Sequence, residues 1–286
     1  MNDHAQDDVG GNSPHLGRQE KRQADEGAPI GPLVIHEIVR EQGVRELGRP
    51  FSGLAWSGLA AGLSIGFSFL MQATLHAGLP DAPWRPLVAG FGYSLGFLIV
   101  ILGRQQLFTE TTLTAMIPAM TSPSWAITLK VLRVWVIVLV ANMVGTAVFG
   151  TAAAIADVFP PATMEAMSEI AHHAIARPFW QTVFTAGSAG WLIGLMVWLL
   201  PGAGPARPLI IILLTYAIAV FGLSHIVAGS VEVVYLVVMG QAGIGDYLLR
   251  FLMPTFIGNV VGGTILAALL NHAPLAKELS DTAEEP

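Results

Sequence analysis

The chain has 286 residues, of which 53% are hydrophobic and only 12% are charged, and its mean hydropathy is +0.61. Soluble domains place charge on about a quarter of their residues, so this composition excludes an ordinary soluble protein and predicts several membrane crossings. The absence of cysteine excludes disulfides and cysteine-based metal or redox sites, and the net charge of −6 argues against a nucleic-acid surface.

The two ends of the chain are polar. Residues 1–33 lack an apolar segment typical of a signal peptide, and we expect a disordered cytoplasmic tail there. Residues 34–50 predict an amphipathic helix in the membrane interface, with Arg40, Arg45 and Arg49 facing lipid headgroups. Residues 273–286 predict a second cytoplasmic tail.

Residues 51–272 predict a transport domain of six membrane spans. Each of six segments has the roughly 20 apolar residues that a spanning helix requires: Phe51–Ala77, Pro86–Pro118, Trp125–Ala156, Pro178–Leu200, Pro208–Gly240 and Tyr247–Asn271. Lysine and arginine are densest before the first span. This asymmetry predicts that both termini lie in the cytoplasm, and we expect a multi-pass protein of the inner (plasma) membrane.

The two halves of this domain repeat. Three short motifs recur in the same order, at offsets of 128, 122 and 117 residues: Gly62–Gly66 with Gly190–Gly194, Pro86-Leu87 with Pro208-Leu209, and Asn142–Gly145 with Asn259–Gly262. Because each repeat holds three spans, the second half must enter from the opposite side of the membrane. The pattern predicts an inverted 3+3 repeat, which places a solute site near the membrane midplane.

The second and fifth spans are each interrupted. Polar residues of Gly103–Glu110 break the second span, and Phe221–His225 break the fifth. Non-helical backbone at membrane depth persists only where it is buried in protein or lines an aqueous cavity. Two breaks in corresponding places therefore indicate one shared pathway.

These motifs resemble the formate/nitrite transporter family over about residues 34–272. The resemblance rests on GRQQLFTETTL at 103–113, GLSH at 222–225, GNVVGG at 258–263 and the six-span layout. It implies an all-α, aquaporin-like fold and a homopentamer in the lipid bilayer, with one pore in each protomer. It also implies a channel or transporter for a small monovalent anion or its weak acid, not an enzyme, without a cofactor or metal.

The resemblance also assigns roles along the pore. Leu107 and Phe108 match the hydrophobic constriction of the family. Thr109 matches a hydroxyl that reaches toward a central histidine, and His225 matches that histidine. Asn259 matches a pore asparagine. A bare anion pays several kcal/mol to enter an apolar ring, and histidine changes charge near physiological pH, so we expect proton exchange at His225. Purely structural roles remain open: core packing for the apolar pair, a helix cap for Thr109, a helix bridge for Asn259, and a backbone contact for His225.

Several positions depart from the family pattern. Ser224 occupies a position where the family typically has an acidic residue. Gly229 occupies a position where the family typically has an asparagine. Arg104 and Glu110 are atypical of formate channels, and we interpret them either as an ion pair or as residues that alter selectivity. The chain therefore resembles a divergent branch whose solute need not be formate or nitrite.

Two other functions fit parts of the sequence. An aquaporin-like channel for small neutral solutes shares the fold logic, although the paired Asn-Pro-Ala motifs of aquaporins are missing. An intramembrane serine protease would use Ser188 with His225. That function requires Gly-x-Ser-Gly, whereas Ser188 directly follows Gly187, and it leaves the repeat unexplained.

Overall fold

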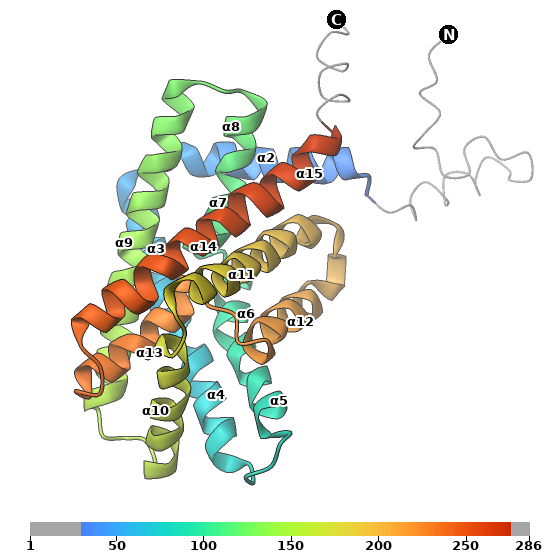
Figure 1. The fold of residues 1–286 in the computed structure, drawn as a ribbon. Coiled ribbons are helices and arrows are strands. Elements are labelled where there is room, and N and C mark those ends of the chain that lie inside the picture. The colour runs from blue at the N-terminus through green and yellow to red at the C-terminus, as the bar shows by residue number, and fades with distance from the viewer. Residues whose placement is uncertain (1–29, 276–286) are drawn as a thin grey trace, which may run out of the picture.

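The computed structural model describes residues 30–275, and every regular element in that range is a helix (Figure 1). Helix α2 (Pro32–Leu47) lies across one end of the helical bundle. It begins at a proline, whose fixed φ suits the first helical turn and whose missing N–H leaves no donor unpaired there. Helix α2 therefore starts at Pro32, within the expected N-terminal tail of residues 1–33. Residues 1–29 and 276–286 of the two expected tails lie outside the described residues.

The first half of the bundle contains three long apolar helical segments and one pair of short helices. The elements are α3 (Phe51–Ser64) and α4 (Gly66–Gly78), then α5 (Arg85–Ala89), the 3₁₀ turn η1 (Gly90–Tyr93) and α6 (Ser94–Leu102), then α7 (Phe108–Thr114) and α8 (Met116–Thr121), and finally α9 (Trp125–Ile155). Helices α3 and α4 run on as one apolar segment of 28 residues.

The second half repeats this plan after helix α10 (Pro161–Ile175). Its elements are α11 (Phe179–Leu199) with the short turns η2 (Leu200–Gly202) and η3 (Gly204–Ala206), then α12 (Arg207–Val220) and α13 (Ile226–Val238), and then η4 (Asp246–Leu252), α14 (Met253–Val261), η5 (Gly262–Leu269), α15 (Leu270–His272) and η6 (Ala273–Leu275). Elements η4 and η5 are π-helical stretches within the last long helix.

Five helical segments within residues 30–275 are long and apolar enough to cross a membrane. They are Phe51–Gly78, Arg85–Leu102, Trp125–Ile155, Phe179–Gly202 and Asp246–Leu275. Where a fifth of six spans was expected, the structure has two shorter apolar helices, Gly204–Val220 and Ile226–Val238, on either side of the second break. The fold is thus all-helical, with several helices of membrane-spanning character.

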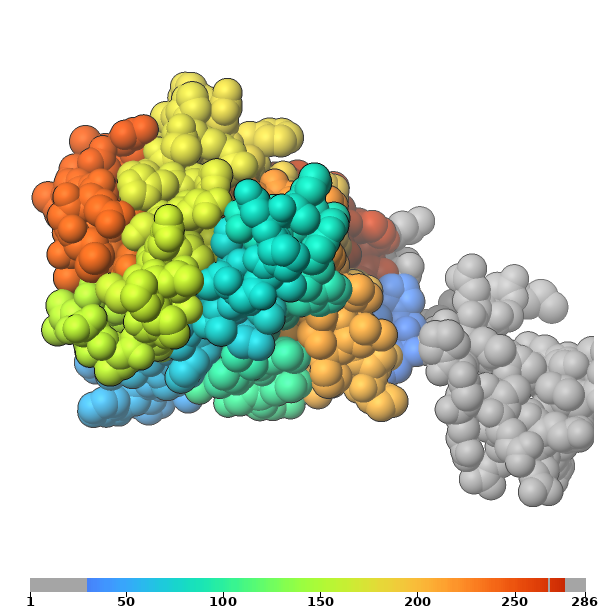
Figure 2. All heavy atoms as spheres, turned by 90° about the horizontal axis from the view of Figure 1, so that it is seen from below, coloured from blue at the N-terminus to red at the C-terminus, as the bar shows by residue number. Residues whose placement is uncertain are grey.

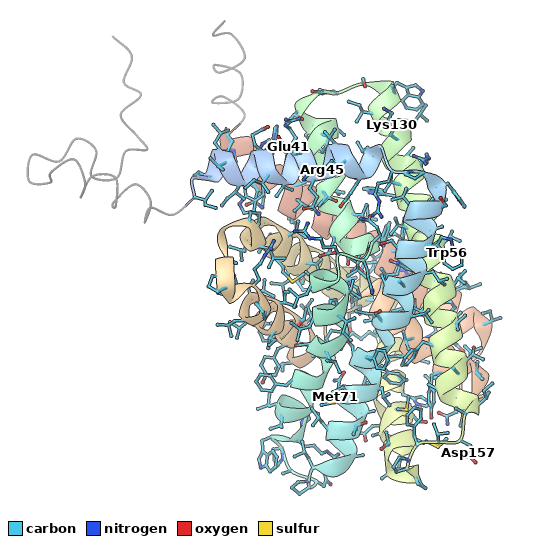
Figure 3. The ribbon with its side chains drawn as sticks, turned by 180° about the vertical axis from the view of Figure 1, so that it is seen from behind. Glu41, Arg45, Trp56, Met71, Lys130 and Asp157 are labelled. Atoms are coloured by element: carbon cyan, nitrogen blue, oxygen red, sulfur yellow. The ribbon has the colours of Figure 1, made fainter. Side chains whose placement is uncertain are left out.

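The outer surface of the bundle is apolar. On α9 the side chains of Val136, Val140, Val144 and Val148 follow one another at every fourth position, and each is about half exposed. Figure 3 shows Trp56 pointing away from the bundle, between one end marked by Lys130 and the other marked by Asp157. Soluble monomers rarely expose continuous apolar surface of this kind, which suits contact with lipid or with other subunits.

Close helix packing is achieved by the same glycines in both halves. A Cβ on Gly62 of α3 would lie 2.3 Å from the carbonyl oxygen of Asn142 on α9. A Cβ on Gly190 of α11 would lie 2.4 Å from the carbonyl oxygen of Asn259 on α14. Small residues let the backbones approach this closely, and the matching contacts bring both asparagines to the bundle interior.

The end of the bundle opposite α2 is formed by the α4–α5 connection and α10. Figure 2 looks at this end and shows α10 next to the residues around the turn between α4 and α5. His76 of α4 and Glu169 of α10 approach to 3.2 Å here, which links these two elements. The molecule therefore has two distinct polar ends, one covered by α2 and one by α10.

Candidate functional site at two helix breaks

The two helix breaks have the same backbone conformation. Helix α6 ends at Leu102 and α7 begins at Phe108, whereas α12 ends at Val220 and α13 begins at Ile226. Within the polar segment Gly103–Glu110, residues 103–107 are non-helical, since α7 begins at Phe108. The second break spans residues 221–225.

The backbone is left-handed two residues after α6 ends and two residues after α12 ends. These residues are Arg104, with φ 51°, and Gly222, with φ 61°. Beyond them, the N–H of Gln105 donates to the carbonyl of Val100 at 2.9 Å, and the N–H of Leu223 donates to that of Ile218 at 2.9 Å. Such bonds satisfy the last carbonyls of a helix and turn the chain away from its axis.

An asparagine holds the first break in place. The N–H of Phe108 donates to Oδ1 of Asn142 at 2.9 Å. The amide Nδ2 of Asn142 donates to the carbonyls of Gly58 (2.7 Å) and Gln106 (2.9 Å). One buried side chain thus ties α3, the break and the start of α7 to α9.

A second asparagine repeats this arrangement at the other break. The N–H of Ile226 donates to Oδ1 of Asn259 at 2.8 Å. The amide Nδ2 of Asn259 donates to the carbonyls of Ala186 (2.8 Å) and Ser224 (3.0 Å). Its side chain is fully buried and both donors are used. These contacts give Asn259 the helix-bridging role that the sequence left open, and its role as a pore asparagine stays a prediction.

Thr109 and His225, which lie 116 positions apart, form a hydrogen bond in the interior. The distance from Thr109 Oγ1 to His225 Nε2 is 2.8 Å, and both side chains are at most 1% exposed. His225 Nδ1 accepts from the N–H of Ala228 at 3.2 Å. Because that N–H can only donate, Nδ1 carries no proton, and Nε2 of the neutral ring is the donor to Thr109.

Apolar side chains surround this pair. The ring of Phe97 meets the imidazole of His225 edge-on, with centroids 5.0 Å apart. Leu107 and Phe108 are fully buried, and Phe108 stacks on Phe256 with centroids 5.8 Å apart. The environment of the pair is therefore both dry and shaped by aromatic rings.

Two cavities approach the pair from opposite sides. The first, here the α10 cavity, has a volume of about 300 Å³ and includes His225 in its lining, with His173, Arg177 and Glu232. The second, here the α2 cavity, has a volume of about 420 Å³ and includes Leu107. His225 lines the first cavity and Leu107, two residues before Thr109, lines the second, so the Thr109–His225 hydrogen bond joins residues beside the two cavities.

The α2 cavity contains charges of both signs. Arg104 and Glu110 both line it, together with Glu46, Arg49 and Arg207. Among the ion pairs of residues 30–275, none joins Arg104 to Glu110, so the geometry does not favour the ion-pair interpretation. The charged groups instead border the space through which a solute would reach Leu107.

Ser188 is not placed as a protease nucleophile. Its hydroxyl donates to the carbonyl of Phe184, one turn earlier on α11, at 3.2 Å. Nε2 of His225 is already bonded to Thr109, and Nδ1 to Ala228. A serine protease needs the serine hydroxyl within hydrogen-bond reach of the base, and within residues 30–275 no such bond joins Ser188 to His225.

Two carboxyl groups that line the cavities were not predicted from the sequence. Glu232 of α13 lines the α10 cavity and is 9% exposed, and Glu46 of α2 lines the α2 cavity and is 7% exposed. Glu232 lies in an otherwise apolar span, which was a usable signal because ionisable residues inside membranes are usually functional. No comparable signal exists for Glu46, since its contact with α7 joins distant parts of the chain.

These features define an all-helical membrane protein of channel fold. A solved structure described as a pentameric formate channel with formate bound shares this fold, with a TM-score of 0.67, 20% identity, and coverage of 83% of this chain and 99% of that chain. A second, described as an FNT family ion channel, has a TM-score of 0.75 at 19% identity, with 85% and 99% coverage.

The family is shown by sequence. The model of the formate/nitrite transporter family matches residues 33–273. Inner membrane protein YfdC of Escherichia coli strain K12 is 38% identical over 280 residues, which are 98% of this chain and 90% of that protein. Formate channel BtFdhC of Bacillus thuringiensis is 27% identical over 87% of this chain and 97% of its own length. The chain therefore belongs to the formate/nitrite transporter family.

Proposed function

We propose that the protein moves a small monovalent anion or its weak acid across the membrane, and that a proton is exchanged at His225 during passage. The observation that carries this proposal is the hydrogen bond of 2.8 Å between Thr109 and His225, located between two cavities. A charged solute loses its hydration where the path becomes dry, at a cost of several kcal/mol, whereas a neutral acid largely avoids that cost. A proton donor at the neck therefore lowers the barrier.

The exchange atom in this proposal is Nε2 of His225. Nδ1 accepts the Ala228 N–H and thereby caps α13, so protonating Nδ1 would break the cap. Nε2 faces Thr109 and carries the proton of the neutral ring. For this proton to pass to the solute, Nδ1 must release the Ala228 N–H and take a proton from water, so that the Nε2–H bond breaks and an O–H bond forms on the anion while the ring stays neutral. Within the described residues, the Thr109 hydroxyl has no other hydrogen-bond partner, which leaves its own hydrogen available to a solute.

The start of α13 also favours an anion at the neck. The N-terminus of a helix carries partial positive charge, and the 13-residue helix α13 begins directly after His225. Half-helices that point their N-termini at the midplane stabilise anionic groups in other transporters. The proposed site thus attracts the anion before it is protonated.

We further propose that the chain crosses the membrane six times in an inverted 3+3 arrangement, with α12 and α13 forming the fifth span. The support is the matched geometry of the two breaks, where Asn142 and Asn259 each accept from the first N–H of a half-helix. In this arrangement the α2 end, which has Arg40, Arg45 and Lys130, faces the cytoplasm together with both termini.

The solute class, location and assembly follow the relatives in this proposal. Several relatives are named formate channels, one solved neighbour is described as pentameric, and YfdC is named an inner membrane protein. We propose a monocarboxylate or similar small anion as solute, a homopentamer, and the inner membrane. The mixed charge of the α2 cavity indicates a selectivity different from that of the formate channels.

The test is flux through proteoliposomes that contain the purified protein. Formate, acetate, lactate, nitrite and hydrosulfide are each presented at two external pH values, with glycerol as a neutral solute. We expect at least one weak acid to enter faster at the lower pH than at the higher pH, beyond the rate of protein-free liposomes. Uptake of glycerol alone, independent of pH, would instead establish the aquaporin-like function and refute the proposal.

A further inference from the structure

Glu232 is a buried carboxyl group that opens into the α10 cavity. It is 9% exposed, and within residues 30–275 no hydrogen bond or ion pair joins its carboxyl to another side chain. Buried carboxyl groups are normally paired, because an unpaired buried charge costs several kcal/mol. A group left unpaired beside a cavity is placed to meet what enters the cavity.

Glu232 shares a helix face with the central histidine. His225, Gly229 and Glu232 all line the α10 cavity, and their spacing of four and then three positions puts them on one side of α13. At a rise of about 1.5 Å per residue, Glu232 lies roughly 10 Å from His225 along the helix axis. That separation exceeds one hydrogen bond, so water or the solute must bridge the two groups.

The other half of the pore has a carboxyl group in the corresponding position. Glu232 is seven residues after His225, and Thr114 is seven residues after Leu107, the matching residue of the first break. The Thr114 hydroxyl donates to Oε2 of Glu46, which lines the α2 cavity. Helix α2 thus supplies, from outside the repeat, the carboxyl group that α13 contains within it.

We propose that Glu232 and Glu46 are proton-exchange groups, one in each cavity, that supply protons to the solute or to water on the two sides of the Thr109–His225 neck. This inference rests on the proposed function and extends it to the two cavities. In each transfer the carboxyl O–H bond breaks and an O–H bond forms on the anion or on water. The carboxylate that remains takes its next proton from water on the same side.

Other titratable groups face both carboxyl groups and contribute to the pH response. Around Glu232 they are His76 of α4, Tyr93 of η1, Glu169 and His173 of α10, Arg177, and His225 on its own helix. Around Glu46 they are Arg45 and Arg49 of the α2 segment, Arg104, Glu110 of α7 and Arg207 of α12. Arg177 is held at the break, since it donates to the carbonyl of Gly222 at 2.6 Å.

The test compares five variants, two glutamine substitutions, two controls and the conservative Glu232→Asp, in right-side-out and inside-out membrane vesicles, with the pH varied on one side at a time. Glu232→Gln and Glu46→Gln keep the side-chain shape but remove the proton. The controls are Glu165→Gln and Glu41→Gln, two exposed carboxyl groups on α10 and α2. Uptake of the weak acid identified in the flux panel is the readout.

We expect each variant to lose the pH response of its own side only. Glu232→Gln should lower uptake about tenfold or more when the α10 side is acidic, and Glu46→Gln should do so for the α2 side, while the controls behave as wild type. Glu232→Asp should restore the response on the α10 side. The inference is overturned if both glutamine variants keep the wild-type pH profile. A wild-type protein without any pH response would instead refute the proposed function.

An infrared measurement keeps the test decisive if Glu232→Gln does not assemble. Difference spectra of the wild type and Glu232→Asp are recorded while the pH is changed on the α10 side. A titrating carboxyl band that differs between the two proteins supports the inference. A band identical in both proteins contradicts it.

Discussion

His225 combines two tasks that depend on different ring nitrogens. Nδ1 completes the start of α13, and Nε2 meets Thr109 in the neck. The cap fixes the orientation of the ring and its neutral tautomer, and leaves Nε2 as the nitrogen that faces the neck in the proposed proton exchange. A phenylalanine at this position would fill similar space but provide neither the cap nor the proton.

Asn259 and Asn142 should be needed for stability in the same way. Asn259→Leu leaves the N–H of Ile226 and the carbonyls of Ala186 and Ser224 without their bonds. The carbonyl of Ala186 keeps its partner within α11, but the N–H of Ile226 and the carbonyl of Ser224 are orphaned at about 1–3 kcal/mol each, so we expect a large fall in the midpoint of thermal unfolding in detergent. Asn142→Leu should cause a similar fall, and a midpoint unchanged by either substitution would contradict the structural role.

Substitutions at the left-handed residues of the two breaks should change the unfolding midpoint in different ways. Arg104 pays about 1 kcal/mol for its φ of 51°, so Arg104→Gly should raise the unfolding midpoint or leave it unchanged despite the flexible glycine. Gly222→Ala should lower it, because an added Cβ would be strained and would lie 2.7 Å from a guanidinium nitrogen of Arg177. Calorimetry of both variants provides the comparison, and equal effects would contradict the matched geometry.

At the scale of elements, α2 is joined to the pore helices by a buried polar contact. Glu46 accepts from Thr114 of α7, and His36 bonds to His272 of α15 with ring nitrogens 3.0 Å apart. Figure 3 shows that Glu41 and Arg45 lie on the same helix at this end of the bundle. The polar contacts fix how α2 covers the α2 cavity.

The pKa of Glu46 predicts a pH dependence of stability. Burial raises this pKa above its ordinary value of 4.5, although hydrogen bonds from Thr114, Gln42 and Gln106 oppose the rise. The neutral carboxyl is therefore favoured in the folded state. Its stabilising contribution is complete below about pH 4.5 and is lost as the pH rises through the higher folded pKa.

The Glu46→Gln variant isolates this effect. We expect its unfolding midpoint to match that of the wild type at low pH and to exceed it progressively as the pH rises, because glutamine cannot ionise. Glu41→Gln is the matched control on the exposed face of α2. A difference between Glu46→Gln and wild type that does not change with pH would contradict the assignment.

The positions of the two helix breaks could be predicted from the sequence, because the signals for them are local. The polar residues of Gly103–Glu110 and Phe221–His225 marked both breaks, and the pairing of Thr109 with His225 followed from the resemblance of those motifs to a known family. The roles of Asn259 and Asn142 could not be predicted, since an asparagine in a span suits both a solute contact and a backbone clamp. Glu46 was hidden because only packing brings α2 against α7.

At the scale of the whole molecule, the apolar face of α9 has two candidate partners, lipid and a neighbouring subunit. The stripe formed by Val136, Val140, Val144 and Val148 contacts either lipid or a neighbouring subunit. In the proposed pentamer, native mass spectrometry of the detergent-solubilised protein should give the mass of five chains. A monomer under conditions that preserve folding would contradict the proposed assembly without affecting the pore within one chain.

In the proposed inverted arrangement, the two halves of one chain together form the pathway. Each half contributes a break, an asparagine and a half-helix, and the only described hydrogen bond between residues 103–110 and 221–225 is that of Thr109 with His225. The sequence repeats predicted the pairing of the halves, but the charges of the two cavities depend on side chains from α2, α10 and α12. Solute selectivity therefore belongs to the assembled molecule rather than to any single motif.

The most direct test of the central claim is simultaneous measurement of weak-acid uptake and internal pH in proteoliposomes containing wild type or His225→Phe. The wild type should acidify the lumen in step with uptake and respond to external pH, whereas His225→Phe should lose the response to pH while Ser188→Ala keeps it. Wild-type pH behaviour in a correctly assembled His225→Phe protein would contradict the account.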